Sequence, residues 1–200
     1  VQTCALPIWR FLTRGHFLMS HPYSLSAAPT DNHLRITIKD LGDHSRATRF
    51  IKKGTRVFVE GPYGAFTAGR ATQPHIVAIG GGVGITPIRA LMEEFKNGVE
   101  MDIFYRVSRQ EELILKDELD YLVANSNGLV RVHYLVGSRK EHPMDAAYIK
   151  ALAPRVADSD IYICGPQALV DTVRKAAEDL GVPKNRFHDE DFAFHPINGG

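Results

Sequence analysis

The sequence predicts an α+β protein of two domains, an antiparallel β-barrel followed by a doubly wound parallel sheet. Short strand-like runs separated by turns fill residues 9–70, which is typical of a barrel or sandwich. From residue 75 onward, apolar runs alternate with segments of helical periodicity, which indicates βαβ units and a parallel sheet. We therefore expect a first domain over residues 9–70 and a second over residues 75–194, joined by a short polar linker at 68–74.

The composition is that of an ordinary globular protein. The chain has 200 residues, 44% of them hydrophobic, and a formal net charge of +1, so bulk charge does not favour a nucleic-acid binder. No apolar run approaches the roughly 18 residues of a membrane span. Cys4 and Cys164 lie far apart and form neither a metal-ligand cluster nor a disulfide framework, which favours a reducing, cytoplasmic setting.

Both ends of the chain are expected to lie outside the fold. Residues 1–8 resemble the translation of a common sequencing adapter, the alternative being a native N-terminus without structure. On the first interpretation, the natural gene continues upstream and the barrel is truncated at its N-terminal side. Residues 195–200 are expected to form a frayed tail.

The N-terminal domain contains short strands and one helical segment. Residues 34–39 alternate apolar and polar side chains, as a half-buried strand does. Residues 57–60 form a second short strand, which is closed by a turn at 61–64. Residues 17–19 lead into a further strand end at 21–26, and residues 45–51 have room for one or two helical turns.

The C-terminal domain alternates strands and helices. Strands are expected at 75–79, 100–106, 130–135, 160–164 and 186–188. Helices are expected at 86–96, 116–123, 145–152 and 167–180.

A glycine-rich loop is the most informative motif. It consists of Gly80, Gly81, Gly82, Val83, Gly84, Ile85, Thr86 and Pro87. A strand directly before the loop and a helix directly after it predict a turn whose backbone N–H groups bind phosphate. The alternative is that the glycines only permit tight packing of the strand against the helix. The loop lacks the third glycine of the common dinucleotide fingerprint and has Pro87 early in the helix, where its fixed φ fits.

The next strand indicates which nucleotide this loop binds. The acidic residue that usually marks NAD binding is absent where residues 101–106 end. Arg106, Ser108 and Arg109 follow instead, and a guanidinium matches the geometry of a ribose 2′-phosphate. We therefore expect NADP, with NAD as the other possibility; the alternative for these residues is a solvated basic loop.

Two further motifs lie at strand ends. Cys164 precedes Gly165 and Pro166 where a strand of the second domain ends, so its thiol is either beside a ligand or a small buried apolar group. In the first domain, His21 and Pro22 precede Tyr23 and Ser24, which offer an aromatic face and a hydroxyl to a planar ligand. A tyrosine at a barrel edge is the alternative for the second motif.

Two motifs of polar residues complete the candidate sites. The turn Gly42-Asp43-His44-Ser45 opens a short helix and offers N–H groups and a hydroxyl to a second phosphate. The segment 188–194 combines Glu190 with Phe192 and Phe194, and it is either a solvated edge or a source of one acid and one ring for an active site.

Together these motifs resemble the ferredoxin–NADP reductase superfamily over residues 9–194. The turns at 42–45 and 61–64 are most similar to the cytoplasmic reductase part of ferric-reductase-like transmembrane proteins and NADPH oxidases. The resemblance implies a flavoenzyme whose first domain binds FAD and whose second domain binds NADP or NAD.

The resemblance also implies roles for the motif residues. Tyr23 stacks on the flavin ring and Ser24 hydrogen-bonds near its N5. Residues 42–45 hold the FAD pyrophosphate, and residues 81–86 hold that of the nicotinamide dinucleotide. The implied catalytic residues are Ser24, Cys164 near the nicotinamide, and Glu190, the family's C-terminal acid. Phe192 matches the aromatic residue that shields the flavin, with Phe194 as the second choice.

The sequence departs from the family pattern at two places. His21 stands where the family has an arginine that contacts phosphate, and a neutral histidine does not replace a bidentate guanidinium. The barrel strands that normally precede Tyr23 are missing, which leaves an open edge. We expect this chain to bind FAD less well than its parent protein does.

The implied activity is transfer of electrons from NAD(P)H through FAD to a one-electron acceptor. The resemblance implies that this acceptor is a haem in a preceding transmembrane domain of the parent chain, with the reductase on the cytoplasmic side and no nucleic-acid partner. One alternative is a soluble oxygenase reductase with an iron–sulfur partner. The other is a nucleotide-binding module that has lost catalysis.

Overall fold

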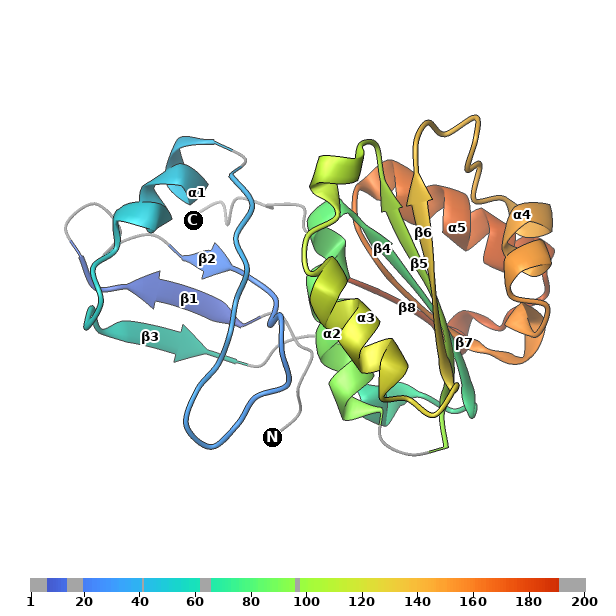
Figure 1. Cartoon of the computed structure of the whole chain (residues 1–200), viewed down its shortest axis with the longest axis horizontal. Helices are drawn as coiled ribbons and strands as arrows, with labels where there is room; N and C mark the ends of the chain where they lie inside the picture. The colour runs from blue at the N-terminus through green and yellow to red at the C-terminus, as the bar shows by residue number, and fades with distance from the viewer. Residues whose placement is uncertain (1–6, 14–19, 41, 62–65, 96–97, 191–200) are drawn as a thin grey trace, which may run out of the picture.

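The structure, a computed structural model, describes residues 7–13, 20–40, 42–61, 66–95 and 98–190. It contains a three-stranded antiparallel sheet followed by a five-stranded parallel sheet with helices, so the predicted two-domain α+β class is confirmed. Figure 1 shows the two sheets side by side, each in its own part of the molecule. Residues 1–6 of the adapter-like start, the segment 17–19, most of the turn at 61–64 and the tail lie outside the described residues. Ile8, which was expected to lie outside the fold, instead begins the strand Ile8–Phe11 and pairs with Pro22 and Glu60.

The C-terminal sheet has the strand order β6-β5-β4-β7-β8, with all neighbours parallel. Its strands are β4 (His75–Gly81), β5 (Glu100–Val107), β6 (Val130–Val136), β7 (Asp160–Cys164) and β8 (Phe187–Glu190). The chain runs outward from β4 to β6 and then returns to the other side of β4. Ligands of such sheets bind at this reversal, beside the carboxyl ends of the strands.

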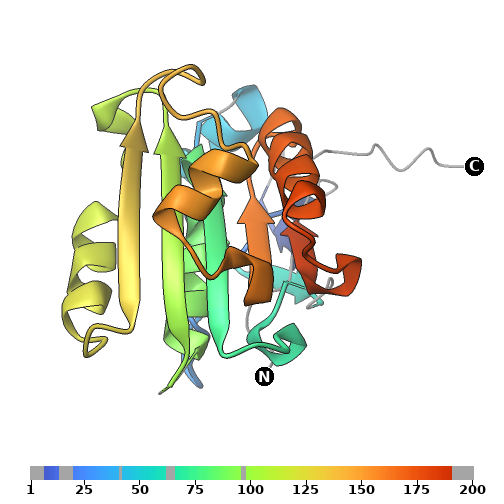
Figure 2. The same ribbon diagram turned by 90° about the vertical axis from the view of Figure 1, so that its right-hand side faces the viewer.

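Helices cover both faces of this sheet. They are α2 (Ile85–Glu94), α3 (Lys116–Ala124), α4 (Ala146–Leu152) and α5 (Gln167–Asp179). In Figure 1, α2 and α3 lie on the face toward the N-terminal domain, and in Figure 2 α4 and α5 lie on the opposite face. The alternation within β4 explains this arrangement: Ile76 and Ala78 pack with α2, whereas Val77 and Ile79 pack into the core beneath α5.

Short 3-10 turns connect several of these elements. They are η2 (Ala68–Arg70), η3 (Gly82–Gly84), η4 (Gln110–Glu112), η5 (Val156–Asp158) and η6 (Lys184–Arg186).

The N-terminal sheet is small and has the order β2-β1-β3. Its strands are β1 (Ile8–Phe11), β2 (His21–Pro22) and β3 (Val57–Glu60), and the helical segment comprises α1 (Asp43–Ala47) and η1 (Thr48–Phe50). Its core consists of Trp9, Phe11 and Leu25. The strand at 57–60 and the helical turns within 45–51 are confirmed.

The predicted strand at 34–39 is wrong. Only an isolated bridge between Leu25 and Ile36 forms there. The alternation has another cause: Ile36 packs against the small core, whereas Arg35 and Thr37 hydrogen-bond to Ser26. Side-chain hydrogen bonds therefore replace the expected backbone ladder.

The connection between the domains is fixed to the second sheet. The carboxylate of Asp160, at the start of β7, accepts the backbone N–H groups of Thr72 and Gln73, both at 2.7 Å. Its other oxygen lies 2.9 Å from Nε2 of His188. The predicted linker is thus attached by side-chain hydrogen bonds to the domain that follows it.

No helix in the described residues is long and apolar enough to cross a membrane. The same residues contain no group of histidine, cysteine, aspartate and glutamate side chains that could hold a metal ion.

Candidate functional site

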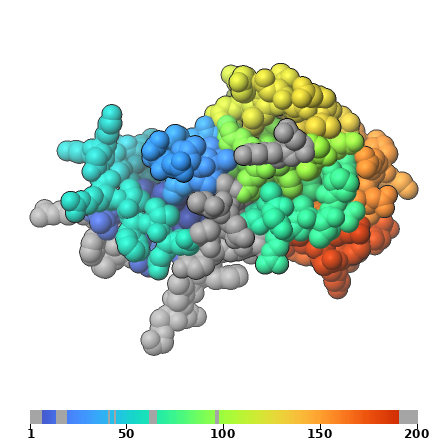
Figure 3. Space-filling model, turned by 90° about the horizontal axis from the view of Figure 1, so that it is seen from below, coloured from blue at the N-terminus to red at the C-terminus, as the bar shows by residue number. Residues whose placement is uncertain are grey.

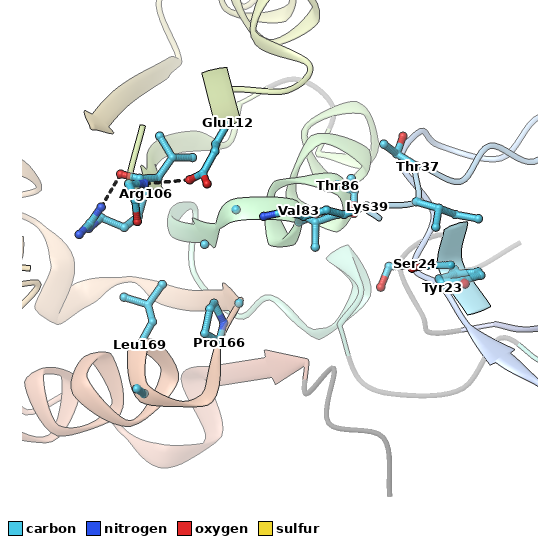
Figure 4. A pocket seen from close by; sticks show the side chains of 18 of the residues that line it. Tyr23, Ser24, Thr37, Lys39, Val83, Thr86, Arg106, Glu112, Pro166 and Leu169 are labelled. Atoms are coloured by element: carbon cyan, nitrogen blue, oxygen red, sulfur yellow. Dashed lines mark hydrogen bonds between the residues drawn. The ribbon is translucent and has the colours of Figure 1, made fainter. Parts of the chain in front are cut away.

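A cleft of about 760 Å³ lies between the two domains, at the carboxyl ends of β4, β5 and β7. Its size is that of a small-molecule site. Figure 4 shows that Tyr23 and Ser24 enter it from the N-terminal domain, while Val83, Arg106 and Pro166 enter it from the other side. The sequence-predicted residues that line it are His21, Pro22, Tyr23, Ser24, Gly42, Ser45, Gly81, Gly82, Thr86, Arg106, Ser108, Gly165 and Pro166.

Other predicted site residues do not line the cleft. Gly80, Gly84, Ile85, Pro87, Cys164 and Glu190 lie behind its wall, and Arg109 lies outside it. The side chain of His44 and the two aromatic residues Phe192 and Phe194 lie outside what the structure describes.

The structure brings Ser24, Cys164 and Glu190 together. Ser24 Oγ donates a hydrogen bond of 3.1 Å to Glu190 Oε2 across the domain boundary. Cys164 stands opposite Glu190 in the register of β7 and β8. All three residues are buried, and three segments far apart in the sequence supply them.

Glu190 has an unusual environment for a carboxyl group. Burial raises its pKa to about 7, and the Ser24 hydroxyl lowers it only in part. Its Oε1 is buried and has no hydrogen-bond partner among the residues that the structure describes. A buried acceptor of this kind, directly behind a residue that lines the cleft, indicates a place for a donor or for a proton.

The glycine-rich loop forms the floor of the cleft. Gly82 has φ +57°, and no atom lies within 4 Å of the place where a Cβ would stand, so its backbone is open to a ligand. Gly81 lies against Pro166 and Leu169, where a Cβ would come within 2.9 Å and 2.8 Å of their side chains. The loop continues through η3 into α2, whose N-terminal end carries the positive end of the helix dipole. The Ile85 N–H already donates to carbonyl oxygens of η3, so the exposed backbone at Gly82 is the part of the loop that is open to an anion. These features fit a bound pyrophosphate.

Two of the glycines serve packing instead. A Cβ on Gly84 would lie 2.0 Å from the carbonyl oxygen of Cys164, and a Cβ on Gly80 would lie 3.0 Å from Cα of Ile85. Gly82 therefore suits the predicted phosphate-binding role, whereas Gly80 and Gly84 suit the alternative role in tight packing.

The far end of the cleft carries charges of both signs. Arg106 and Ser108 line it, as does Glu112, whose Oε2 accepts the Ser108 N–H at 3.1 Å. This hydrogen bond is the main reason that the pKa of Glu112 lies below its usual value, so Glu112 is ionised. Arg109 is 75% exposed and pairs with Glu112 at 3.3 Å instead of entering the cleft.

Tyr105 fixes the position of Glu112. Its buried hydroxyl donates to the Glu112 carbonyl oxygen and accepts the Ile114 N–H, both at 3.0 Å. The short loop after β5 is therefore held in place from within the sheet.

On the N-terminal side of the cleft, His21 is a packing residue. Its ring stacks on Tyr23, with centroids 5.6 Å apart and an angle of 5° between the planes, and it also contacts Phe11. Trp9 Nε1 donates to the Tyr23 carbonyl oxygen at 2.9 Å. These contacts orient Tyr23, whose pKa is raised by burial.

Sequence reasoning missed several lining residues. These are Thr37, Ile38 and Lys39 on one side and Glu112, Arg139, His142, Pro143 and Met144 on the other. Glu112 carried a signal, since it is an acid a few residues after the strand end, although not at the expected position. The segment 139–144 follows β6 at the same edge of the sheet, where ligands gather.

Comparisons with known proteins agree with this geometry. A family model described as an FAD-binding domain matches residues 4–67, and one described as an oxidoreductase NAD-binding domain matches residues 78–175. The chain is 30% identical over 190 residues to NADH-cytochrome b5 reductase 1 of Pyricularia oryzae, covering 86% of this chain. It is 30% identical over 189 residues to the electron transfer component of 2-halobenzoate 1,2-dioxygenase from Burkholderia cepacia, covering 87% of this chain.

Solved structures share the fold. The flavohem-like FAD/NAD binding domain of nitric oxide dioxygenase from Vibrio cholerae has a TM-score of 0.73 and 26% identity, over 94% of this chain and 83% of that one. The cytochrome b5 reductase domain of Ulva prolifera nitrate reductase has a TM-score of 0.78 and 19% identity, over 95% of this chain and 85% of that one. The chain spans 61% of the Pyricularia relative and 54% of the Burkholderia relative.

Proposed function

Because the chain belongs to the ferredoxin–NADP reductase superfamily, we propose that it is an electron-transfer module that oxidises NAD(P)H through FAD and reduces a one-electron acceptor. The observation that carries the proposal is the hydrogen bond between Ser24 and Glu190. It joins the Tyr23–Ser24 segment to the sheet whose glycine-rich loop forms the floor of the same cleft.

The residues present fit both cofactors. Tyr23 offers a ring that its neighbours hold in place, and Gly42 and Ser45 line the cleft on the same side, where the FAD pyrophosphate is proposed to lie. Gly82 offers an exposed backbone beside the α2 N-terminus for the second pyrophosphate. When bound, FAD accepts a hydride from the nicotinamide and releases electrons singly, which is chemistry that no side chain here supplies.

The protein residues orient the reactants and manage one proton. Ser24 is a hydrogen-bond donor and acceptor at the end of the Tyr23 segment, and Glu190 holds it in place. With its pKa raised to about 7, Glu190 is partly protonated at neutral pH, so it holds a proton in the buried site beside Ser24 Oγ that an ordinary carboxyl would have lost. Cys164 ends β7 and is fully buried, and Gly165 after it packs against the backbone of Gly81, so this wall of the cleft is tightly packed.

The acceptor is a separate part of the proposal. The relatives include reductases named for cytochrome b5 and an electron transfer component named for a dioxygenase. We propose that the acceptor is a haem. More specifically, we propose that this haem belongs to a membrane domain of the parent protein, with this module on the cytoplasmic side. The dioxygenase relative favours a second candidate, an iron–sulfur acceptor of an oxygenase.

Anaerobic titration tests the cofactor part of the proposal. The purified chain is loaded with FAD, freed of unbound flavin, and mixed with NADH or NADPH. Loss of the oxidised flavin absorbance band is expected with at least one nucleotide. A chain that retains FAD but is reduced by neither nucleotide contradicts the proposed activity.

Acceptor assays test the remaining part. With NADH or NADPH in excess, reduction of a cytochrome b5-type haem protein is compared with reduction of a two-iron ferredoxin. Faster reduction of the haem protein supports the first candidate, and faster reduction of the ferredoxin supports the second.

A further inference from the structure

Four charged side chains connect the two domains away from the cleft. They are Arg35 of the N-terminal domain with Arg89, Glu93 and Glu118 of the C-terminal domain, and we refer to them as the interdomain network. None of the four lines the cleft. Figure 3 shows the N-terminal atoms in blue pressed against the green and yellow atoms of the C-terminal domain.

Arg35 binds Glu118 with both arms of its guanidinium. Nη1 donates to Oε1 at 3.1 Å and Nη2 donates to Oε2 at 2.9 Å. Nε of Arg35 also donates to Ser26 Oγ at 3.2 Å, and Ser26 N donates to the Arg35 carbonyl oxygen. A bidentate pair whose arginine is already held by its own domain has a defined geometry, unlike a typical surface ion pair.

Arg89 lies between the two carboxylates. Its side chain is only 9% exposed, its Nε is 2.8 Å from Glu118 Oε2, and its Nη1 donates to Glu93 Oε2 at 2.6 Å. Glu93 Oε2 also accepts the Ala28 N–H of the N-terminal domain at 2.7 Å. The network thus fixes the segment of residues 26–35 at both of its ends.

This segment and the two helices lead directly to the cleft. The segment begins two residues after Ser24 and ends two residues before Thr37, which lines the cleft. Glu93 lies on α2, which starts at the glycine-rich loop, and Glu118 lies on α3, which follows the loop that carries Glu112. A change in the network is transmitted to the cleft through these short segments.

We infer that the interdomain network sets the angle between the domains at which Ser24 meets Glu190, and that Arg35 and Arg89 are positioning residues for hydride transfer. The inference rests on the proposed function for its kinetic consequence. Its structural consequence is independent of that function: loss of the network frees residues 26–35 from the C-terminal domain.

The test compares four variants of the full chain with the wild type. Arg35→Gln and Glu118→Gln each remove one side of the bidentate pair at partly exposed positions, where folding is least affected. Arg89→Met removes the buried cation, so Glu93 loses its ion-pair partner and Glu118 keeps only Arg35. Arg155→Gln is the matched control, because it breaks an exposed pair with Glu100 within one domain.

Two measurements are made on each variant. Hydrogen–deuterium exchange follows the backbone of residues 24–37, and single-turnover absorbance follows flavin reduction at saturating NADH or NADPH. We expect faster exchange in this segment and roughly tenfold slower reduction in the three network variants, with unchanged FAD affinity, because a small misplacement of reacting groups is costly. The control is expected to match the wild type.

A double-mutant cycle makes the test specific to the pair. The double variant Arg35→Gln/Glu118→Gln is expected to be no slower than Glu118→Gln, because Glu118→Gln already removes the Arg35 interaction together with the Arg89 ion pair. Unchanged exchange and unchanged reduction in Arg35→Gln and Glu118→Gln, or fully additive effects, overturn the inference. A wild-type chain that is not reduced contradicts the proposed function instead, and the exchange measurement still decides whether the network holds the segment.

Discussion

Ser24 and Glu190 are 166 positions apart in the chain, yet Ser24 Oγ donates a hydrogen bond to Glu190 Oε2 at 3.1 Å in a buried site. The bond joins the segment that follows β2 in the N-terminal domain to the edge strand β8 of the parallel sheet. Glu190 of β8 also lies opposite Cys164 of β7. The hydrogen bond therefore brings Ser24 to the place where Cys164 and Glu190 already lie side by side.

Replacing Ser24 with alanine removes the only donor that the described residues offer to the Glu190 side chain. We expect flavin reduction by NAD(P)H to slow by about 100-fold, the lower end of the typical contribution of one positioned proton-transfer group. Stopped-flow absorbance measures the rate, and Ser24→Thr, which keeps a hydroxyl, is the control. Equal rates for Ser24→Ala and the wild type would contradict a role for the hydroxyl.

The raised pKa of Glu190 makes stability depend on pH. Between the ordinary carboxyl value of 4.5 and the folded value of about 7, the folded chain binds more protons than the unfolded chain. Stability therefore falls as pH rises through this window, by about 3 kcal/mol at most. Glu190→Gln removes this contribution to the pH dependence of stability.

Urea unfolding at several pH values across this window measures the effect. The difference in unfolding free energy between wild type and Glu190→Gln is expected to shift in favour of the variant as pH rises. A constant difference over the window would show that Glu190 does not titrate there.

Nucleotide preference is expected to depend on Glu112 more than on Arg109. Glu112 is an ionised carboxylate in the cleft wall, where it repels a ribose 2′-phosphate, whereas Arg109 is largely exposed. Glu112→Gln should raise the NADPH-to-NADH ratio of kcat/KM by roughly tenfold, a modest electrostatic effect.

Arg109→Ala is the matched variant, because it removes the other partner of the same ion pair. In Arg109→Ala, the NADPH-to-NADH ratio of kcat/KM is expected to stay within about twofold of the wild type, because an exposed ion pair contributes little free energy. A large loss of NADPH activity in Arg109→Ala would instead support the sequence-based role of this arginine.

Two glycines of the loop are expected to respond differently to alanine. Gly84→Ala places a Cβ 2.0 Å from the Cys164 carbonyl oxygen, so it should lower the unfolding free energy by about 3 kcal/mol or more. Gly82→Ala meets no atom but keeps φ at +57°, so it should cost only about 1 kcal/mol. Thermal unfolding of both variants measures the difference, and equal losses would contradict the packing role of Gly84.

The parallel sheet could be predicted well from the sequence because its signals are local. The central strands β4 and β7 are mostly apolar and fully buried, and β7 has the predicted bounds, residues 160–164. The prediction for segment 34–39 failed because alternation does not distinguish a ladder from a loop whose polar side chains reach other partners. In this case Arg35 reaches Glu118, 83 positions away.

The candidate site was predictable where a motif supplied the residue type. Tyr23, Ser24 and the glycine-rich loop could be identified from motifs, and the structure brings them to one cleft. The interdomain network could not be identified, because its members come from four separate positions with no common pattern. Arg109 was predicted to bind a ribose 2′-phosphate only because it is an arginine near the strand end. The structure shows that it forms an ion pair with Glu112.

Anaerobic stopped-flow reduction of the FAD-loaded chain is the decisive measurement for the proposed electron transfer. We predict that NADH or NADPH bleaches the oxidised flavin band in the wild type, and that Ser24→Ala and Glu190→Gln slow this step without releasing FAD. Retention of FAD with no bleaching by either nucleotide, or equal rates in all three proteins, would contradict the proposed roles of the flavin and of the Ser24–Glu190 pair.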